Sequence, residues 1–161
     1  MTEIRIVCVG KVKEAYFRDG IASSLKFIEK KYRTRLMECE DEATPDDCPE
    51  TVRQRILDRE GERILSKISR EDYVIALCIE GKPRTSDGLA KVVRARMSQL
   101  ARSGGNLVFV IGGSLGLSAG VLSRADEQLS FSAMTFPHQM MRLILADQLA
   151  SIVRKDLSGK G

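Results

Sequence analysis

The sequence predicts one α/β domain with a mostly parallel sheet and helices on both of its faces. Short apolar runs alternate along the chain with longer amphipathic segments, and this alternation is typical of a parallel sheet. Two of the runs, 73–79 and 107–111, are almost continuously apolar, as expected for strands that are covered on both faces. The 161 residues contain no linker or internal repeat, so we expect a single domain over 1–161.

The first half of the chain is expected to contain two strands and two helices. Ile4–Val9 is rich in β-branched residues and ends at Gly10, which predicts a strand. Apolar residues spaced three and four apart predict an amphipathic helix over 14–31. The remaining expected elements are a weaker strand over Arg35–Cys39, an acidic loop over Glu38–Glu50, and a helix with Pro49 in its first turn that runs to about Ser69.

The second half repeats this alternation. Gly81-Lys82-Pro83 is expected to break the strand over Tyr73–Ile79, and Thr85 or Ser86 is suited to cap the helix that follows. The other expected elements are the end of that helix near Ser103, a strand over Asn106–Ile111, a short helix over Ser118–Ala125, a strand near Gln128–Ser132 and a last helix opened by Pro137.

Composition and charge exclude several classes of protein. Hydrophobic residues make up 43% and charged residues 30% of the chain, as in globular proteins. No apolar run approaches the ~20 residues that cross a bilayer, and the charged residues near the start predict no signal-peptide core. The four cysteines form no CxxC pair and lie far in sequence from the single histidine. We therefore expect reduced thiols, no metal, no membrane association and a cytoplasmic location.

The basic charge is concentrated in the second half. Residues 1–81 carry 15 basic and 17 acidic side chains, whereas residues 82–161 carry 11 basic and 5 acidic ones. A basic surface permits contact with a polyanion, but it is equally expected of an ordinary solvated surface.

Three strand ends are the strongest candidates for a binding site, namely 77–81, 111–116 and 131–137. In an open α/β sheet, ligands bind at the carboxyl ends of strands. The pocket predicted there, lined by backbone groups and apolar side chains, suits a flat heterocycle. A larger side chain at Gly112 is expected to occupy ligand space. Without a phosphate-binding motif, the glycine turn is also consistent with a strand-to-helix connection that binds nothing.

His138 and Arg142 lie four residues apart, on one face of the last predicted helix. They are candidates for orienting the site and for positioning a phosphate or a base. The alternatives are a histidine that satisfies nearby backbone groups and an arginine in an ordinary surface ion pair. The sequence offers neither a carboxylate pair nor a Ser-His-Asp arrangement.

Several segments of the chain resemble the RlmH family, the ribosomal large-subunit pseudouridine N3-methyltransferases of the SPOUT superfamily. Two long segments carry most of the resemblance, Phe109–Ser118 (FVIGGSLGLS) and Leu129–Leu149 (LSFSAMTFPHQMMRLILADQL). Three shorter ones are Ile6–Lys11 (IVCVGK), Leu57–Gly61 (LDREG) and Leu77–Pro83 (LCIEGKP). The resemblance spans roughly residues 3–149 with the family's spacing.

The resemblance implies a fold, a cofactor and partners that the residue pattern does not predict. The fold would be an α/β knot whose C-terminal segment forms a trefoil, in a homodimer. The donor would be S-adenosyl-L-methionine, and the acceptor would be N3 of a pseudouridine in 23S rRNA. Arg84, Arg94, Arg96 and Arg102 are candidates for contacts with rRNA phosphates. The cofactor-binding residues would be Leu77, Gly112, Phe131, Ser132, Ala133, Met134, Thr135 and Phe136.

The end of the chain departs from the family. Members of the family usually continue the last helix with Tyr-Arg-Ala and end in a tail that contains Pro-Tyr-His, whereas here Leu149 is followed by ASIVRKDLSGKG. The alternative expectation is therefore a knotted RNA- or ribosome-binding protein that keeps the cofactor pocket but is catalytically impaired. A generic nucleotide-binding domain is a third possibility.

Overall fold

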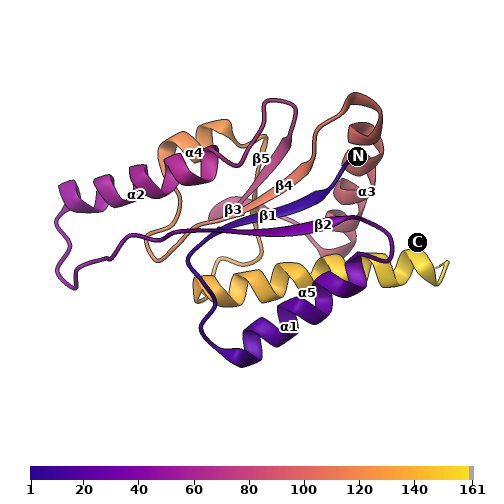
Figure 1. The fold of residues 1–161 in the computed structure, drawn as a ribbon, viewed down its shortest axis with the longest axis horizontal. Helices are drawn as coiled ribbons and strands as arrows, with labels where there is room; N and C mark the ends of the chain where they lie inside the picture. Colours follow the sequence, from indigo (N-terminus) through magenta and orange to yellow (C-terminus); the bar gives the residue numbers. More distant parts are fainter. Residues whose placement is uncertain (160–161) are drawn as a thin grey trace.

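Five parallel strands form the single sheet of the computed structural model, which describes residues 1–159 (Figure 1). Across the sheet their order is β2-β1-β4-β3-β5, and each neighbouring pair is parallel. The strands are β1 (Ile4–Val9), β2 (Thr34–Cys39), β3 (Tyr73–Pro83), β4 (Leu107–Ile111) and β5 (Glu127–Ser130). The predicted α/β fold with a parallel sheet is therefore confirmed.

Helices cover both faces of this sheet (Figure 1). One face packs against α1 (Ala15–Ile28), α3 (Ser86–Ser103) and α5 (His138–Leu157), and the other against α2 (Glu50–Leu65) and α4 (Ala119–Arg124). The Thr85 side chain accepts a hydrogen bond from Gly88 N at 3.0 Å, which confirms the predicted cap of α3. Helix α2 is shorter than predicted, since Pro49 precedes its first residue and it ends at Leu65.

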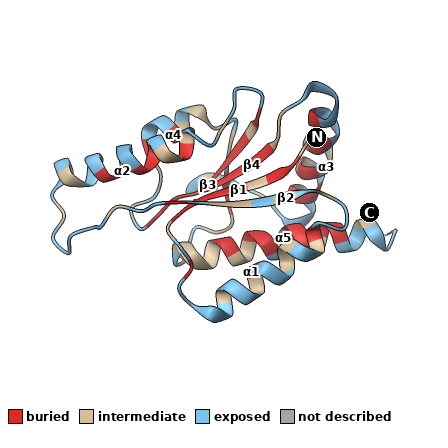
Figure 2. Cartoon of the chain, viewed as in Figure 1, coloured by how far each residue is buried: buried red, intermediate tan, exposed pale blue. Residues whose placement is uncertain are grey.

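The core has two halves because side chains alternate along the strands. Ile4 and Ile6 of β1 and Phe109 of β4 join the half that includes α1, α3 and α5. Val7 of β1 and Val110 of β4 join the smaller half, beneath α2 and α4. Figure 2 shows the buried central strands between the partly exposed helices. The central strands are thus buried on both faces, and a binding site is expected in the loops at the ends of the strands.

The predicted break of β3 at Gly81-Lys82-Pro83 is wrong. Leu77 and Lys82 both pair with Leu129 of β5, so the residues between them leave the ladder and the strand then resumes. At Gly81 a Cβ atom would lie 2.7 Å from the carbonyl carbons of Gln128 and Leu129, an approach that only glycine allows. The glycine therefore marks a backbone contact rather than a strand end. The trefoil knot stays a prediction.

Three further observations bear on the predicted class. No helix in the described part of the chain, 1–159, is long and apolar enough to cross a membrane. All four cysteines carry free thiols, as predicted. Burial raises the pKa of Cys8 to about 12, which makes its thiol unreactive at neutral pH.

Candidate functional site

The three predicted strand ends meet at one cavity of about 900 Å³. It lies at the carboxyl ends of β4 and β5 and beside the irregular part of β3 after Leu77, the edge at which ligands bind in open α/β sheets. Its volume falls in the range of ligand-binding pockets. The residues that line it are Arg53, 77–80, 111–117, Leu122, Gln128, Phe131, Ser132, 134–138 and Met141. The prediction that these bends share one pocket is confirmed.

The glycine turn after β4 forms the floor of this cavity. Gly116 N donates to Gly113 O at 3.1 Å, and Gly116 has a φ of +90°, which favours glycine. A Cβ atom at Gly116 would meet no protein atom within 4 Å. At Gly112, in contrast, a Cβ atom would lie 2.3 Å from Gly116 O. The expectation that a side chain at Gly112 would fill ligand space is therefore wrong, because it would collide with the turn itself.

The bend after β5 supplies a second wall. Ser130 Oγ donates to Ser132 O at 3.0 Å, and Met134 N donates to Ser132 Oγ at 3.0 Å. Of the cofactor-binding residues expected here, Ala133 is exposed and outside the lining. The others, Phe131, Ser132, Met134, Thr135 and Phe136, line the cavity together with Leu77 and Gly112.

His138 lines the cavity at the first residue of α5. Its side chain is half-buried, and burial together with the charge of Arg142 lowers its pKa below the usual 6.5, against an opposing effect of Asp41. The imidazole is therefore neutral at physiological pH, and a neutral imidazole can accept a proton or a hydrogen bond.

Arg142 does not line the cavity. Its side chain is fully buried, with Nη1 donating to Glu38 Oε2 at 2.8 Å and Nη2 to Val9 O at 2.9 Å. The guanidinium is therefore engaged within the chain rather than presented to the cavity. It does not form an ordinary surface ion pair either, because the guanidinium is fully buried, although its partner Glu38 is exposed. Arg142 instead fixes the start of α5 against β1 and β2.

Two residues beside the cavity escaped the sequence reasoning. Arg53 of α2 is exposed and lines the cavity, and Glu60 of the same helix is buried beneath the glycine turn. Nothing in the sequence indicates that α2 lies near the glycine turn, so the sequence does not predict that Arg53 lines the cavity. Glu60 lies in the Leu57–Gly61 segment, which resembles a family but has no residue pattern that predicts a place near the cavity.

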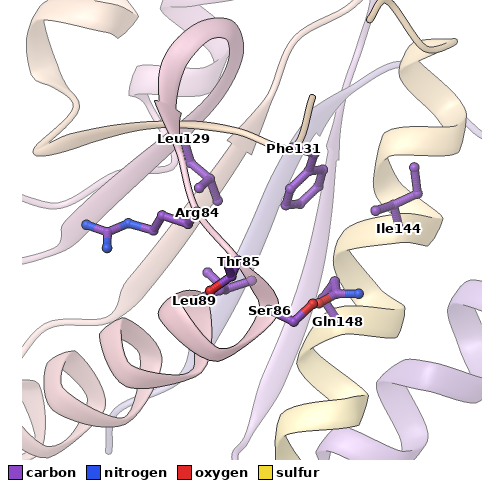
Figure 3. Close-up of a pocket in the computed structure, with 8 residues that line it drawn as sticks. All are labelled: Arg84, Thr85, Ser86, Leu89, Leu129, Phe131, Ile144 and Gln148. Carbon is purple, nitrogen blue, oxygen red and sulfur yellow. The ribbon is translucent and has the colours of Figure 1, made fainter. Parts of the chain in front are cut away.

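Phe131 also borders a second, smaller cavity of about 150 Å³ (Figure 3). This one lies where α3 begins, with Ile144 and Gln148 of α5 on its opposite side. Arg84, which borders it, forms an ion pair with Glu127. Its small size makes the larger cavity the better candidate for a ligand of cofactor size.

Most of the arginines proposed to contact RNA are engaged within the chain. Arg94 pairs with Asp156 at 2.8 Å, and Arg96 lies 4.1 Å from the centre of the Tyr73 ring. Within residues 1–159, no cluster of histidine, cysteine, aspartate and glutamate side chains is arranged to hold a metal ion. The cavity itself is lined by the glycine turn, by apolar side chains and by a few polar ones, among them Arg53 and His138.

Comparison with known proteins yields consistent matches over nearly the whole chain. A family model described as "Predicted SPOUT methyltransferase" matches residues 2–154. The chain is 50% identical over 147 residues to ribosomal RNA large subunit methyltransferase H of Bacillus pumilus, which covers 91% of this chain and 90% of the relative. The protein of the same name from Streptococcus thermophilus is 44% identical over 147 residues, 91% of each chain.

Solved structures show the same fold at low sequence identity. A probable methyltransferase from Bordetella pertussis Tohama I aligns with a TM-score of 0.55 at 15% identity, covering 94% of this chain and 96% of that one. A putative methylase family protein from Neisseria gonorrhoeae aligns with a TM-score of 0.54 at 11% identity, covering 99% and 95%.

The burial of Arg142 predicts a large effect on stability. Arg142→Met removes both hydrogen bonds and leaves Glu38 and Val9 O without their donor. We expect the free energy of unfolding to fall by about 2 kcal/mol, because the buried Val9 O loses this donor, measured by urea unfolding followed by circular dichroism. Arg59→Met, which removes an exposed ion pair with Glu42, should cost less than about 1 kcal/mol. Equal effects of the two substitutions would contradict a structural role for Arg142.

The single histidine makes its environment directly measurable. We expect the proton resonances of the His138 ring to titrate by NMR with a midpoint below 6.5. Because the pKa is lowered on folding, His138 contributes stability that is present above about pH 6.5 and is lost as the pH falls through the folded pKa. Asp41→Asn should lower the midpoint further, whereas Asp46→Asn, the control, should leave it unchanged. A midpoint above 6.5 would show that the ring is neither buried nor near Arg142.

Proposed function

Because the chain belongs to the SPOUT methyltransferases, in the ribosomal RNA large subunit methyltransferase H family, we propose that it methylates large-subunit ribosomal RNA. We propose further that S-adenosyl-L-methionine is the donor and that N3 of a pseudouridine is the acceptor. The observation that carries this proposal is the single cavity at which the irregular part of β3 after Leu77 meets the bends after β4 and β5.

The residues of the cavity fit such a donor. Adenine needs an apolar slot with backbone groups along one edge, and Leu77, Ile111 and the 131–136 bend supply these features. The open space at Gly116 lets a ligand approach the backbone closely. When bound, S-adenosyl-L-methionine supplies an electrophilic methyl group on sulfur. The chain's contribution is to hold and orient the reactants, which can lower a barrier by as much as ~7–11 kcal/mol.

His138 is the residue best placed to assist the acceptor. The N3 imide of a pseudouridine carries a proton that must be lost. A neutral imidazole at the cavity wall is able to accept a hydrogen bond from that group. The acceptor base must also leave its stack to enter the cavity, as is usual where a protein acts on a loop nucleotide.

Arg53 is the proposed phosphate contact. Of the arginine and lysine side chains among residues 1–159, it is the only one that lines the cavity. It is exposed, so it can follow a phosphate of a splayed-out nucleotide without the cost of desolvating a buried charge.

We also propose a homodimer. Large apolar side chains are exposed near the cavity mouth, with Ile79 50% and Met134 69% exposed. A second copy that covers them would complete the walls around the acceptor.

A transfer assay tests the proposed function. Purified protein, S-adenosyl-L-methionine and ribosomes that lack the modification should yield a methyl group on N3 of a pseudouridine in 23S rRNA, located by mass spectrometry. Ribosomes that contain uridine at that position are the matched control. Failure of S-adenosylhomocysteine to bind in calorimetry would overturn the methyltransferase proposal.

The altered C-terminus favours one second candidate, an RNA-binding protein that keeps the cavity without transferring a methyl group. Helix α5 continues to Leu157, and Ile152 and Val153 are buried in the core. Residues 139–161 contain neither tyrosine nor histidine. Binding of S-adenosylhomocysteine without transfer in the assay would identify this candidate.

Arg53 gives a prediction that separates RNA binding from donor binding. We expect Arg53→Gln to weaken RNA binding and to reduce the slope of log affinity against log salt concentration by about 0.7–1, measured by filter binding over a salt series. The affinity for S-adenosylhomocysteine should not change. Arg55→Gln, an exposed neighbour outside the cavity lining, is the control. An equal loss in both variants would assign Arg53 to the general surface charge.

A further inference from the structure

Glu60 is buried between three segments that are far apart in the sequence. Its side chain belongs to α2, yet Oε2 accepts a hydrogen bond from Glu42 N, in the acidic loop, at 3.0 Å. Its other oxygen, Oε1, lies 3.3 Å from the position that a Cβ atom of Gly113 would occupy. Glu60 is 4% exposed, and it does not line the cavity. The carboxyl group therefore lies beneath the glycine turn, on the side away from the cavity.

The next residue makes the same connection. A Cβ atom at Gly61 would lie 2.3 Å from Ser118 Oγ, and Ser118 caps α4 by accepting from Val121 N at 3.2 Å. Helix α2 thus approaches both ends of the Gly112–Ser118 segment. Glu60 lies near Gly113, and Gly61 lies near Ser118. A third contact joins the acidic loop to the turn directly, between Thr44 Oγ1 and Ser114 Oγ at 3.3 Å.

The carboxyl group has an incomplete set of partners. Oε1 is buried and has no hydrogen-bond partner among the described residues. A buried carboxylate without a donor is costly, whereas the neutral acid is far less so. Burial raises the pKa of Glu60, and the charges of Asp41 and Glu42 add to this effect, whereas the hydrogen bond from Glu42 N and the charge of Arg63 oppose it. The burial of the unpartnered Oε1 and the two neighbouring carboxylates favour the protonated acid.

We propose that Glu60 is a positioning residue for the donor-binding turn, holding Gly113 at a fixed distance from the acidic loop in its protonated form. This proposal rests on the proposed function, because it assigns the glycine turn to the methyl donor. Its basis is one buried carboxyl group that accepts a hydrogen bond from the loop, at Glu42 N, and lies where a side chain of Gly113 would point. Loss of this contact lets the turn move relative to the bends at Leu77 and Phe131, and the donor then meets a mispositioned backbone.

Four variants of the full chain test the proposal, with S-adenosylhomocysteine as the probe in calorimetry. Glu60→Ala removes the hydrogen bond from Glu42 N and the packing beside Gly113. We expect the dissociation constant for S-adenosylhomocysteine to rise about tenfold in this variant, as for the loss of one buried hydrogen bond. Glu60→Gln keeps the shape and an acceptor for Glu42 N, and it should restore most of the affinity. Glu62→Gln, an exposed glutamate of the same helix, is the control. Glu60→Asp, which is too short to reach both partners, replaces Glu60→Ala if that variant does not fold.

The pH profile distinguishes positioning from general stabilisation. As the pH rises, Glu60 ionises in the wild type and the affinity should fall, whereas Glu60→Gln should lack this component and Glu62→Gln should retain it. Titration of His138 is common to all variants and cancels in the comparison. Wild-type affinity in Glu60→Ala, or in Glu60→Asp where that variant replaces it, overturns the positioning role while the proposed function stands. Affinity in Glu60→Gln as low as in Glu60→Ala overturns the protonated form. If the wild type binds no S-adenosylhomocysteine, the proposed function is wrong, and the positioning role that rests on it is wrong as well.

Discussion

The buried guanidinium of Arg142 is the interaction on which the arrangement of the cavity depends. It joins the first turns of α5 to the carboxyl ends of β1 and β2, through Val9 O and Glu38. A charge of this kind is tolerated in the interior only when it is paired and hydrogen-bonded. Because His138 and the 131–136 bend directly precede this anchor in sequence, their distance from the sheet is set by it. Arg142 thus positions one wall of the cavity without lining the cavity itself.

The remaining walls rest on close backbone approaches. At Gly81, Gly112 and Gly61 a side chain would collide with a neighbouring segment, and each of these glycines lets two segments pack more closely than any other residue would allow. Gly81 brings β3 against β5, and Gly61 brings α2 against the cap of α4. These close approaches fix the backbone segments that surround the cavity.

The sequence predicted the strands, the helices and the meeting of three strand ends, because these follow from apolar periodicity and from the geometry of parallel sheets. It failed where the outcome depends on contacts between distant segments. The burial of Arg142 requires Glu38, 104 residues away, and the resumption of β3 after Gly81 requires the backbone of β5. Arg53 and Glu60 entered the site because α2 lies beside the glycine turn, which local pattern does not specify.

The parallel topology has a consequence for the biosynthesis of the molecule. Every strand pairing joins residues at least 30 positions apart, since even the first, between β1 and β2, pairs Ile4 with Thr34, so hairpins cannot nucleate the sheet and folding is expected to be slow. The cavity also takes its last wall from Phe131, Ser132, 134–138 and Met141, while Arg142, the anchor of that wall, bonds to β1 and β2, which precede it by about 100 residues or more. The pocket can therefore form only after α5 has left the ribosomal exit tunnel. A shorter nascent chain is not expected to bind the ligand.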